Sequence, residues 1–205
     1  MLDRWTHAIV QPPLRLLACC LPRSVTPDRV SLIGFATGML VVPVLFCQWY
    51  QLALVLVLAN RVLDGLDGAL ARRRGGSDAG GFLDITLDFI FYPAVVVGFI
   101  LANPSENAVP GAVLLFSFMG ATSSFLAFAV MSEKYGIKRA QFASKALHYS
   151  SGLAEGTETI LFFAAMCLFP GYFSALAWLF SCLCLVTTAT RLYGGYQQIR
   201  KAEAH

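Results

Sequence analysis

Charged side chains are scarce in this sequence. Only 13% of its 205 residues are Asp, Glu, Lys or Arg, and 57% are hydrophobic, whereas about 25% of a soluble domain is charged. The deficit excludes an ordinary water-soluble protein and indicates an integral membrane protein. The apolar runs do not alternate with polar residues as barrel strands do. We therefore expect a helical bundle, because helices satisfy their own backbone groups in lipid.

The sequence also shows no Cys-x-x-Cys motif, no signal-peptide pattern and no internal repeat. The six cysteines form no Cys-x-x-Cys pair, and their scatter over apolar segments favours small buried side chains over metal ligands or disulfides. The first residues lack the apolar run and cleavage-like site of a signal peptide, so we expect insertion through the transmembrane helices themselves. The absence of a repeat argues against the inverted-repeat architecture of many transporters.

The first 25 residues are expected to form a segment distinct from the spans. Leucines and a tryptophan there are mixed with Arg4, His7 and Arg15, and Pro12-Pro13 interrupts the pattern. These features predict an amphipathic segment that lies in the membrane interface rather than across it. The following Thr26-Pro27-Asp28 is typical of a helix start, with a hydroxyl N-cap, a first-turn proline and an acid near the positive helix end.

Residues 26–205 contain apolar stretches long enough to cross a bilayer. A span needs about 20 residues to cross about 30 Å of hydrocarbon. The expected fold is an all-α membrane protein with six transmembrane helices and an N-terminal interfacial amphipathic segment, in one domain over residues 1–205. The spans are predicted at residues 28–48, 51–73, 79–103, 109–132, 146–169 and 172–198.

Lys and Arg residues gather on one side of this arrangement. The termini and the loops at 72–79 and 132–145 carry them, whereas the opposite loops have none. By the positive-inside rule, both termini and these loops are cytoplasmic. We expect a multi-pass protein of the bacterial inner membrane, with its functional site on the cytoplasmic side.

Four aspartates lie within the second and third predicted spans. Asp64 and Asp67 are three residues apart and Asp84 and Asp88 are four apart, so each pair shares one helix face. Counted from the turn between the spans, Asp67 matches Asp84 in depth, and Asp64 matches Asp88. At about 1.5 Å per residue, the sequence predicts a carboxylate cluster just inside the cytoplasmic interface.

Such a cluster is unfavourable in a low-dielectric setting unless cations neutralise it. Oxygen ligands select hard divalent ions, and Mg²⁺ is held by a few carboxylates together with substrate phosphates. Gly65 and Gly68 leave room beside the carboxylates, and Arg72 is within reach of a phosphate. Arg73 and Arg74 are interpreted as topology signals only. The pattern favours chemistry on a pyrophosphate, in which a free carboxylate deprotonates the attacking hydroxyl.

These residues carry a resemblance to a known family. The pattern Asp-x-x-Asp-Gly-x-x-Ala-Arg followed by Gly-x-x-x-Asp-x-x-x-Asp resembles the signature of the CDP-alcohol phosphatidyltransferases, and the length and span number also suit that family. Seven residues separate the arginine from the second glycine, where the family usually has eight. The positions that match are Asp64, Asp67, Gly68, Ala71, Arg72, Gly80, Asp84 and Asp88.

The resemblance implies transfer of a substituted phosphate from a CDP-linked lipid donor, expected to be CDP-diacylglycerol, to a polar alcohol or alcohol phosphate. CMP is released, and two divalent ions, Mg²⁺ or Mn²⁺, take part. It also implies membrane-lipid contacts, a homodimer and no nucleic-acid partner. The metal-binding residues would be Asp64, Asp67, Asp84 and Asp88, and Asp88 would also act as the general base. Gly68, Ala71, Arg72 and Gly80 would border the donor, and Thr26 is a further nucleotide-contact candidate.

The acceptor site is less defined by the sequence. Basic residues of the 132–145 loop suit a phosphorylated acceptor and suit lipid headgroups equally well. Ionisable groups deep in the spans, including Arg61, suit either substrate contact or Arg–Glu pairing between helices. His148 is a further candidate, with solvation the preferred interpretation. The acceptor candidates are Lys134, Arg139, Lys145, Glu155, Glu158 and Arg191.

Two other functions remain open at this stage. Intramembrane prenyltransferases also combine aspartate clusters, metal and pyrophosphate, although they usually have more helices and another aspartate spacing. A divalent-cation transporter would place carboxylates deeper in the bilayer and show internal symmetry. An assay of CMP release and an assay of cation flux distinguish the CDP-alcohol transferase from the cation transporter.

Overall fold

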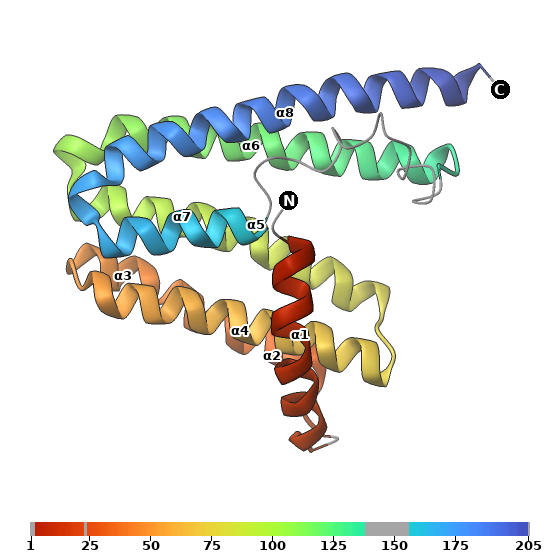
Figure 1. Cartoon of the computed structure of the whole chain (residues 1–205), viewed down its shortest axis with the longest axis horizontal. Coiled ribbons are helices and arrows are strands. Elements are labelled where there is room, and N and C mark those ends of the chain that lie inside the picture. The colour runs from red at the N-terminus through yellow and green to blue at the C-terminus, as the bar shows by residue number, and fades with distance from the viewer. Residues whose placement is uncertain (1–2, 23, 138–155, 205) are drawn as a thin grey trace.

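The computed structural model describes residues 3–22, 24–137 and 156–204, and these ranges are helical apart from short connections. The all-α prediction is confirmed. Figure 1 shows the order of the elements along the chain. Their bounds are α1 Asp3–Cys20, α2 Pro27–Met39, α3 Val41–Phe46, α4 Tyr50–Arg74, α5 Asp78–Ala102, α6 Pro104–Lys134, α7 Gly156–Leu168, the 3-10 turn η3 Pro170–Tyr172 and α8 Phe173–Glu203.

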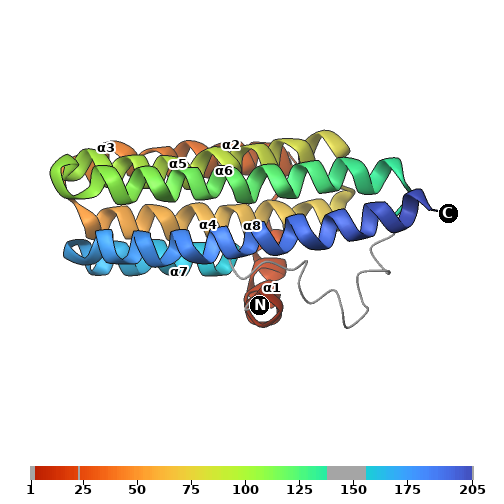
Figure 2. The same ribbon diagram turned by 90° about the horizontal axis from the view of Figure 1, so that it is seen from above.

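The helices from α2 to α8 run side by side as a bundle, and α1 crosses them at a steep angle (Figures 1 and 2). Neighbouring pairs include α6 with α8, α2 with α4, α3 with α5, and α1 with α4. The α4–α5 turn and the C-terminal ends of α6 and α8 lie at one end of the bundle (Figure 1). That end carries Arg72–Arg74, Lys134, Arg200 and Lys201, whereas the described connections at the opposite end contain no Lys or Arg.

Four segments are long and apolar enough to cross a membrane: residues 27–46, 78–102, 104–134 and 170–203. The first combines α2 and α3. Large apolar side chains such as Phe116 and Met119 are exposed on the bundle surface, as expected of a lipid-facing helix. Of the two other predicted spans, α4 has the required length and contains charged residues, and α7 is a shorter apolar helix. The first ten residues of the predicted span 146–169 lie outside the described residues.

Aromatic rings fill the core at the end of the bundle distant from the aspartates. Phe99 of α5 stacks on Phe173 of α8 with 4.8 Å between ring centroids, and Phe162 of α7 stacks on Phe180 of α8 at 4.4 Å. Offset aromatic pairs of this kind contribute about 0.5–1.5 kcal/mol beyond their buried area. The packed end holds α5, α7 and α8 in place, so the other ends of these helices can line a cavity.

Helix α1 is held by contacts that the sequence did not reveal. Arg73 donates to the Ala18 carbonyl oxygen at 2.9 Å, and Arg74 donates to the carbonyl oxygens of Leu21, at 2.9 Å, and Val25. Arg73 therefore anchors the end of α1 and Arg74 anchors the segment that follows it, in addition to contributing charge, which corrects their assignment to topology alone. The helix also continues through Pro12, where the sequence predicted an interruption.

Helices α2 and α5 each begin at a capping side chain. Thr26 is the N-cap of α2, with its hydroxyl oxygen accepting from the Arg29 amide at 3.4 Å, as predicted. Ser77 caps α5 by accepting from the Gly80 amide at 3.0 Å. Helix α4 ends at Arg74, and its C-cap Gly75 has φ of 91°, a conformation that glycine adopts without strain. The short turn brings α5 back along α4.

Candidate metal and nucleotide site

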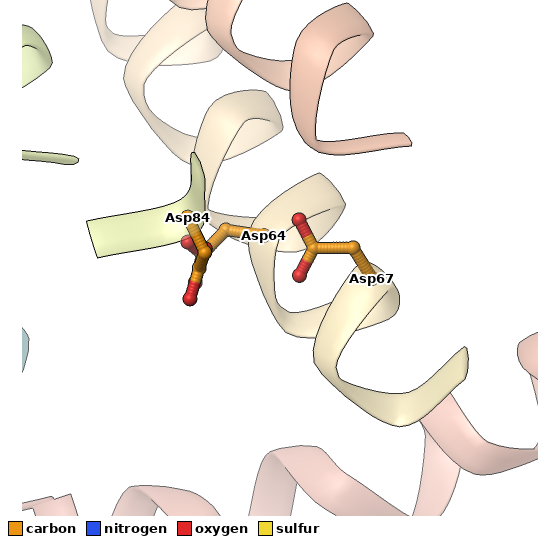
Figure 3. A group of neighbouring side chains, drawn as sticks. All are labelled: Asp64, Asp67 and Asp84. Atoms are coloured by element: carbon orange, nitrogen blue, oxygen red, sulfur yellow. The ribbon is translucent and has the colours of Figure 1, made fainter. Parts of the chain in front are cut away.

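Three aspartates converge where α4 faces α5. Oxygen atoms of Asp64, Asp67 and Asp84 lie within 4.8 Å of one another. Figure 3 shows the carboxylates of Asp64 and Asp84 side by side, with that of Asp67 turned toward them. The predicted convergence of the two helix faces is therefore confirmed for these three residues.

Asp67 is fixed by a residue of a third helix. Ser31 of α2 donates from its hydroxyl to Asp67 Oδ2 at 2.5 Å, and only 4% of Asp67 is exposed. The Ser31 hydroxyl is also 3.2 Å from the Pro27 carbonyl oxygen, so the contact with the carboxylate is the shorter one. Sequence reasoning missed Ser31, because nothing in a lone serine one turn into a helix identifies its partner 36 residues away.

Asp88 has a different set of partners. Arg61 donates to both of its oxygens, from Nη2 to Oδ1 at 3.1 Å and from Nη1 to Oδ2 at 3.3 Å. Tyr92, one turn further along α5, donates to Oδ2 at 3.1 Å. Arg61 Nη2 also lies 2.5 Å from Asp64 Oδ2. Arg61 thus pairs with two aspartates, where the sequence suggested a glutamate or the substrate, and Tyr92 was not predicted.

Two cavities meet at Asp88 and Tyr92. The first has a volume of about 500 Å³ and is bordered by α1, α4, α5 and α7. The second has a volume of about 340 Å³ and lies between α5, α6, α7 and α8. The first contains all four aspartates, Arg61, Gly68 and Arg72 in its lining, and the second contains Phe89, Phe118, Thr122, Phe125, Thr159 and Arg191. Asp88 is thus accessible from both sides.

The predicted donor residues fall into two groups. Gly68 and Arg72 line the first cavity, and a Cβ atom on Gly68 would lie 3.2 Å from Arg72 Nη1, so the glycine lets the guanidinium fold over the helix. The lining of that cavity does not include Ala71, Gly80 or Thr26 among the described residues. Gly80 instead has the Asp28 carboxylate beside it, where a Cβ atom would lie 2.9 Å from Oδ1.

Gly65 has a different neighbour from the one expected. A Cβ atom there would lie 2.6 Å from Leu14 Cδ1, so α1 fills much of the space that the sequence assigned to a ligand. Leu14 and Gln11 of α1 also line the first cavity. The interfacial helix therefore forms part of the cavity wall, which its amphipathic pattern alone did not indicate.

The acceptor candidates are dispersed. Arg191 of α8 lines the second cavity, donates to the Ala121 carbonyl oxygen at 3.3 Å and lies over the Phe125 ring at 5.6 Å from its centroid. Lys134 lies at the end of α6 over the Tyr135 ring, and Glu158 lies in the first turn of α7. The candidates Arg139, Lys145 and Glu155, together with His148, lie outside the described residues.

The residues of the cluster fit a hard divalent cation. All three convergent side chains offer carboxylate oxygens, which suit Mg²⁺ and Mn²⁺ rather than softer ions. Asn60 lines a small pocket together with the aspartates, and its Oδ1 atom is buried without a hydrogen-bond partner in the part of the chain described. A buried oxygen without a partner is costly, and a bound cation or its water would satisfy it.

Comparison with known proteins places these features in context. The model of the CDP-alcohol phosphatidyltransferase family matches residues 24–190, which include every aspartate of the cluster. The chain is 52% identical to the inner membrane protein YnjF of Escherichia coli strain K12 over 204 residues, which cover 99% of each chain. The match with YnjF extends over α1, which the family model leaves out.

Two solved structures share the fold. Both are of a phosphatidylinositol phosphate synthase (PgsA1) from Mycobacterium tuberculosis, each with a TM-score of 0.65. The structure with CDP-DAG bound is 20% identical and covers 92% of this chain and 94% of its own. The structure in complex with manganese and citrate is 21% identical and covers 91% and 88%. At these identities the likeness concerns the arrangement of the helices.

Proposed function

The chain belongs to the CDP-alcohol phosphatidyltransferase family, and we propose that it transfers a phosphatidyl group from CDP-diacylglycerol to the hydroxyl group of a polar alcohol or alcohol phosphate. CMP is the second product. Membership of the family gives the reaction class, phosphatidyl transfer in phospholipid synthesis. The observation that carries the proposal is the convergence of Asp64, Asp67 and Asp84 in a cavity that also presents Gly68 and Arg72.

The divalent ions, two Mg²⁺ or Mn²⁺ by analogy with the family, would be held by Asp64, Asp67 and Asp84 together with Asp88, which lines the same small pocket. Once bound, such ions neutralise the charge on the donor diphosphate and on the departing CMP. The manganese in the similar synthase structure supports this assignment. Ser31 keeps Asp67 in the orientation that faces the other two carboxylates. The protein holds these carboxylate groups on two helices, α4 and α5, so the metal ligands are preorganised before the ions bind.

The donor would occupy the first cavity. Arg72 contributes a planar fork suited to a phosphate, and Gly68 leaves space for the guanidinium to approach it. We assign Ala71, Gly80 and Thr26 to the rim of the nucleotide site, as the family pattern implies. The CDP-DAG bound in the similar synthase supports a lipid-linked cytidine diphosphate as the donor.

Asp88 is the proposed general base. It lies where the two cavities meet, so an acceptor in the second cavity can present its hydroxyl group to the carboxylate. Asp88 takes the hydroxyl proton as the oxygen forms a bond to the donor phosphorus, and the bond between that phosphorus and CMP breaks. Arg191 is the acceptor-binding residue we favour, with Lys134, Arg139, Lys145, Glu155 and Glu158 as further candidates.

The protein is a multi-pass inner-membrane protein, supported by its apolar helices and by its similarity to YnjF. We infer that α4 and α7 complete six spans, because both run alongside the four longer apolar segments (Figure 2). The concentration of Lys and Arg at the end of the bundle nearest the aspartates supports a cytoplasmic site and cytoplasmic termini. A homodimer, implied by the family, is tested by sedimentation in detergent.

Purified protein in detergent tests the proposal. With Mn²⁺, CDP-diacylglycerol and a panel of acceptors that includes glycerol phosphate and inositol phosphate, CMP should be released with at least one acceptor. Asp88→Asn should retain donor binding and lose transfer by about 100-fold or more. The proposal would be overturned in favour of a transporter if labelled cation crossed proteoliposome membranes and no CMP were released from the donor with any acceptor.

A further inference from the structure

Asn60 of α4 is a buried amide close to the aspartates. It lies one helical turn before Asp64 and two turns before Asp67, so its side chain is on the same face of α4 as these two residues. Only 4% of Asn60 is exposed. A buried amide is unfavourable unless both its nitrogen and its oxygen find partners. Both ends of this side chain therefore need an explanation.

The nitrogen end of the amide is bound to α2. Asn60 Nδ2 donates to the Gly34 carbonyl oxygen at 3.1 Å. A Cβ atom on Gly38, one turn further along α2, would lie 2.9 Å from Nδ2, so this glycine leaves the space that the amide occupies. In the reverse orientation the amide oxygen would meet the Gly34 carbonyl oxygen, and neither atom can donate. The contact with α2 thus fixes which way the Asn60 oxygen faces.

The oxygen end of the amide has no protein partner among the described residues. Asn60 Oδ1 is buried and accepts no hydrogen bond within that part of the chain. Asn60 lines a pocket of about 10 Å³ together with Ser31 and the four aspartates. A space of that size is about enough for one water molecule or ion. The unused oxygen therefore belongs to the pocket in which the carboxylates meet.

We propose that Asn60 supplies an uncharged oxygen to the divalent-cation site through Oδ1, which binds the ion directly or through one water molecule on the ion. The inference rests on the metal binding of the proposed function and adds a residue outside the family signature. Amide carbonyl oxygens are among the ligands of hard cations. An amide that only joined α4 to α2 would use its nitrogen and leave the burial of its oxygen uncompensated.

The charge of the site explains why an amide suits this position. Four carboxylates already line the pocket, and a fifth would add repulsion between like charges before any ion binds. Asparagine adds an oxygen and no charge. Because Gly34 holds the nitrogen end, the oxygen is oriented before the ion arrives.

The test compares Mn²⁺ affinity, measured by electron paramagnetic resonance without donor or acceptor, with Tm in Mn²⁺ and in EDTA. Asn60→Ala should bind Mn²⁺ about 10-fold more weakly. Its Tm should fall further below that of wild type in Mn²⁺ than in EDTA, because an ion that binds the folded protein more weakly stabilises it less.

Asn107→Ala is the matched control. Asn107 Nδ2 of α6 also donates to a carbonyl oxygen of a neighbouring helix, that of Phe99 at 2.8 Å, at the end of α5 distant from the aspartates. Its replacement should lower Tm equally in Mn²⁺ and in EDTA and leave Mn²⁺ affinity unchanged. An Asn60→Ala protein that behaves in the same way would overturn the proposal.

Two variants of similar size separate the oxygen of Asn60 from its nitrogen. Asn60→Asp loses the amide nitrogen and keeps an oxygen, so it should bind Mn²⁺ at least as tightly as wild type while its Tm in EDTA falls. Asn60→Leu fills the space without an oxygen and should bind Mn²⁺ about 10-fold more weakly. Equally weak binding by both would assign the effect to the Gly34 contact and refute the proposal. This pair decides the matter if Asn60→Ala does not fold.

The outcome is separable from that of the proposed function. Wild-type protein that binds Mn²⁺ and releases no CMP would refute the transferase assignment, whereas the affinities of the Asn60 variants would still test the ligand. If CMP is released, the Mn²⁺ concentration for half-maximal release should be about 10-fold higher for Asn60→Ala than for wild type. An unchanged Mn²⁺ requirement would count against the role of Asn60.

Discussion

Ser31 and Asp67 are 36 residues apart in sequence and joined by a 2.5 Å hydrogen bond. This bond joins α2, which precedes the aspartate motif in the sequence, to Asp67 of the motif on α4. It fixes the orientation of the Asp67 carboxylate. Mutation of a residue that hydrogen-bonds to a ligating carboxylate typically lowers metal affinity by about 10–100-fold. The first span of the chain therefore takes part in the site.

Replacement of Ser31 by alanine tests this contact. Ser31→Ala should lower Mn²⁺ affinity about 10-fold, because Asp67 loses the donor that fixes its orientation. Electron paramagnetic resonance of purified protein measures the bound ion. Ser123→Ala is the matched control, since this exposed serine bonds only within α6 and its loss should leave affinity unchanged. Equal affinities for the two variants would remove Ser31 from the site.

Gly38 of α2 lies close to side chains of both α4 and α5. A Cβ atom there would lie 2.9 Å from Asn60 Nδ2 and 2.9 Å from Phe91 Cε2, both in the buried core. Gly38→Ala should therefore destabilise the protein by about 1–3 kcal/mol, read as a lower Tm in detergent. Gly194→Ala is the control, because a Cβ atom on that α8 glycine meets no atom within 4 Å and alanine favours a helix. A Gly38→Ala protein as stable as the control would contradict this packing.

Arg74 should hold the end of α1 against the bundle. Arg74→Gln removes charge-assisted hydrogen bonds to the carbonyl oxygens of Leu21, Pro22 and Val25, each typically contributing about 1.5–3 kcal/mol. Hydrogen exchange of the amides near the end of α1 should accelerate, while α6 and α8 keep their protection. Arg200→Gln, at the far end of α8, serves as the control and should change neither. Identical exchange in both variants would show that the Arg74 hydrogen bonds do not hold this end of α1.

Arg72 should bind the donor through its fork. Arg72→Lys keeps the charge and loses the bidentate geometry, so the KM for CDP-diacylglycerol should rise about 10-fold with a smaller change in kcat. Arg200→Lys lies outside the matched family region and should behave as wild type. A normal KM for Arg72→Lys would place the donor phosphate elsewhere in the cavity.

The sequence predicted the features that depend on spacing along a single helix. The spacing of Asp64 and Asp67 predicted that they share one face of α4, the spacing of Asp84 and Asp88 predicted a shared face of α5, and Thr26-Pro27 located the start of α2. Partners across helices were not predictable, because a serine, a tyrosine or an arginine in a helix does not specify which neighbour it will meet. The pairing of Arg61 with Asp88 depends on the rotation of α4 against α5, which the packed aromatic core sets.

For the N-terminal segment too, the sequence predicted the helix but not its contacts with other helices. Its amphipathic composition predicted a helix that does not cross the bilayer, and Figure 1 shows α1 crossing the bundle. The role of Leu14, which occupies the space beside Gly65, arises only when α1 packs on α4. A glycine beside a carboxylate is thus an ambiguous pattern: the missing side chain can admit a ligand or a neighbouring helix.

The most direct test of the metal site is Mn²⁺ binding by wild-type protein and by the Asp67→Asn/Asp84→Asn double variant, measured by electron paramagnetic resonance in detergent. The carboxylate cluster predicts that wild type binds Mn²⁺ and that the double variant, with its fold intact by circular dichroism, retains almost none. Equal binding by the two proteins would contradict the assignment of Asp64, Asp67 and Asp84 as the metal site.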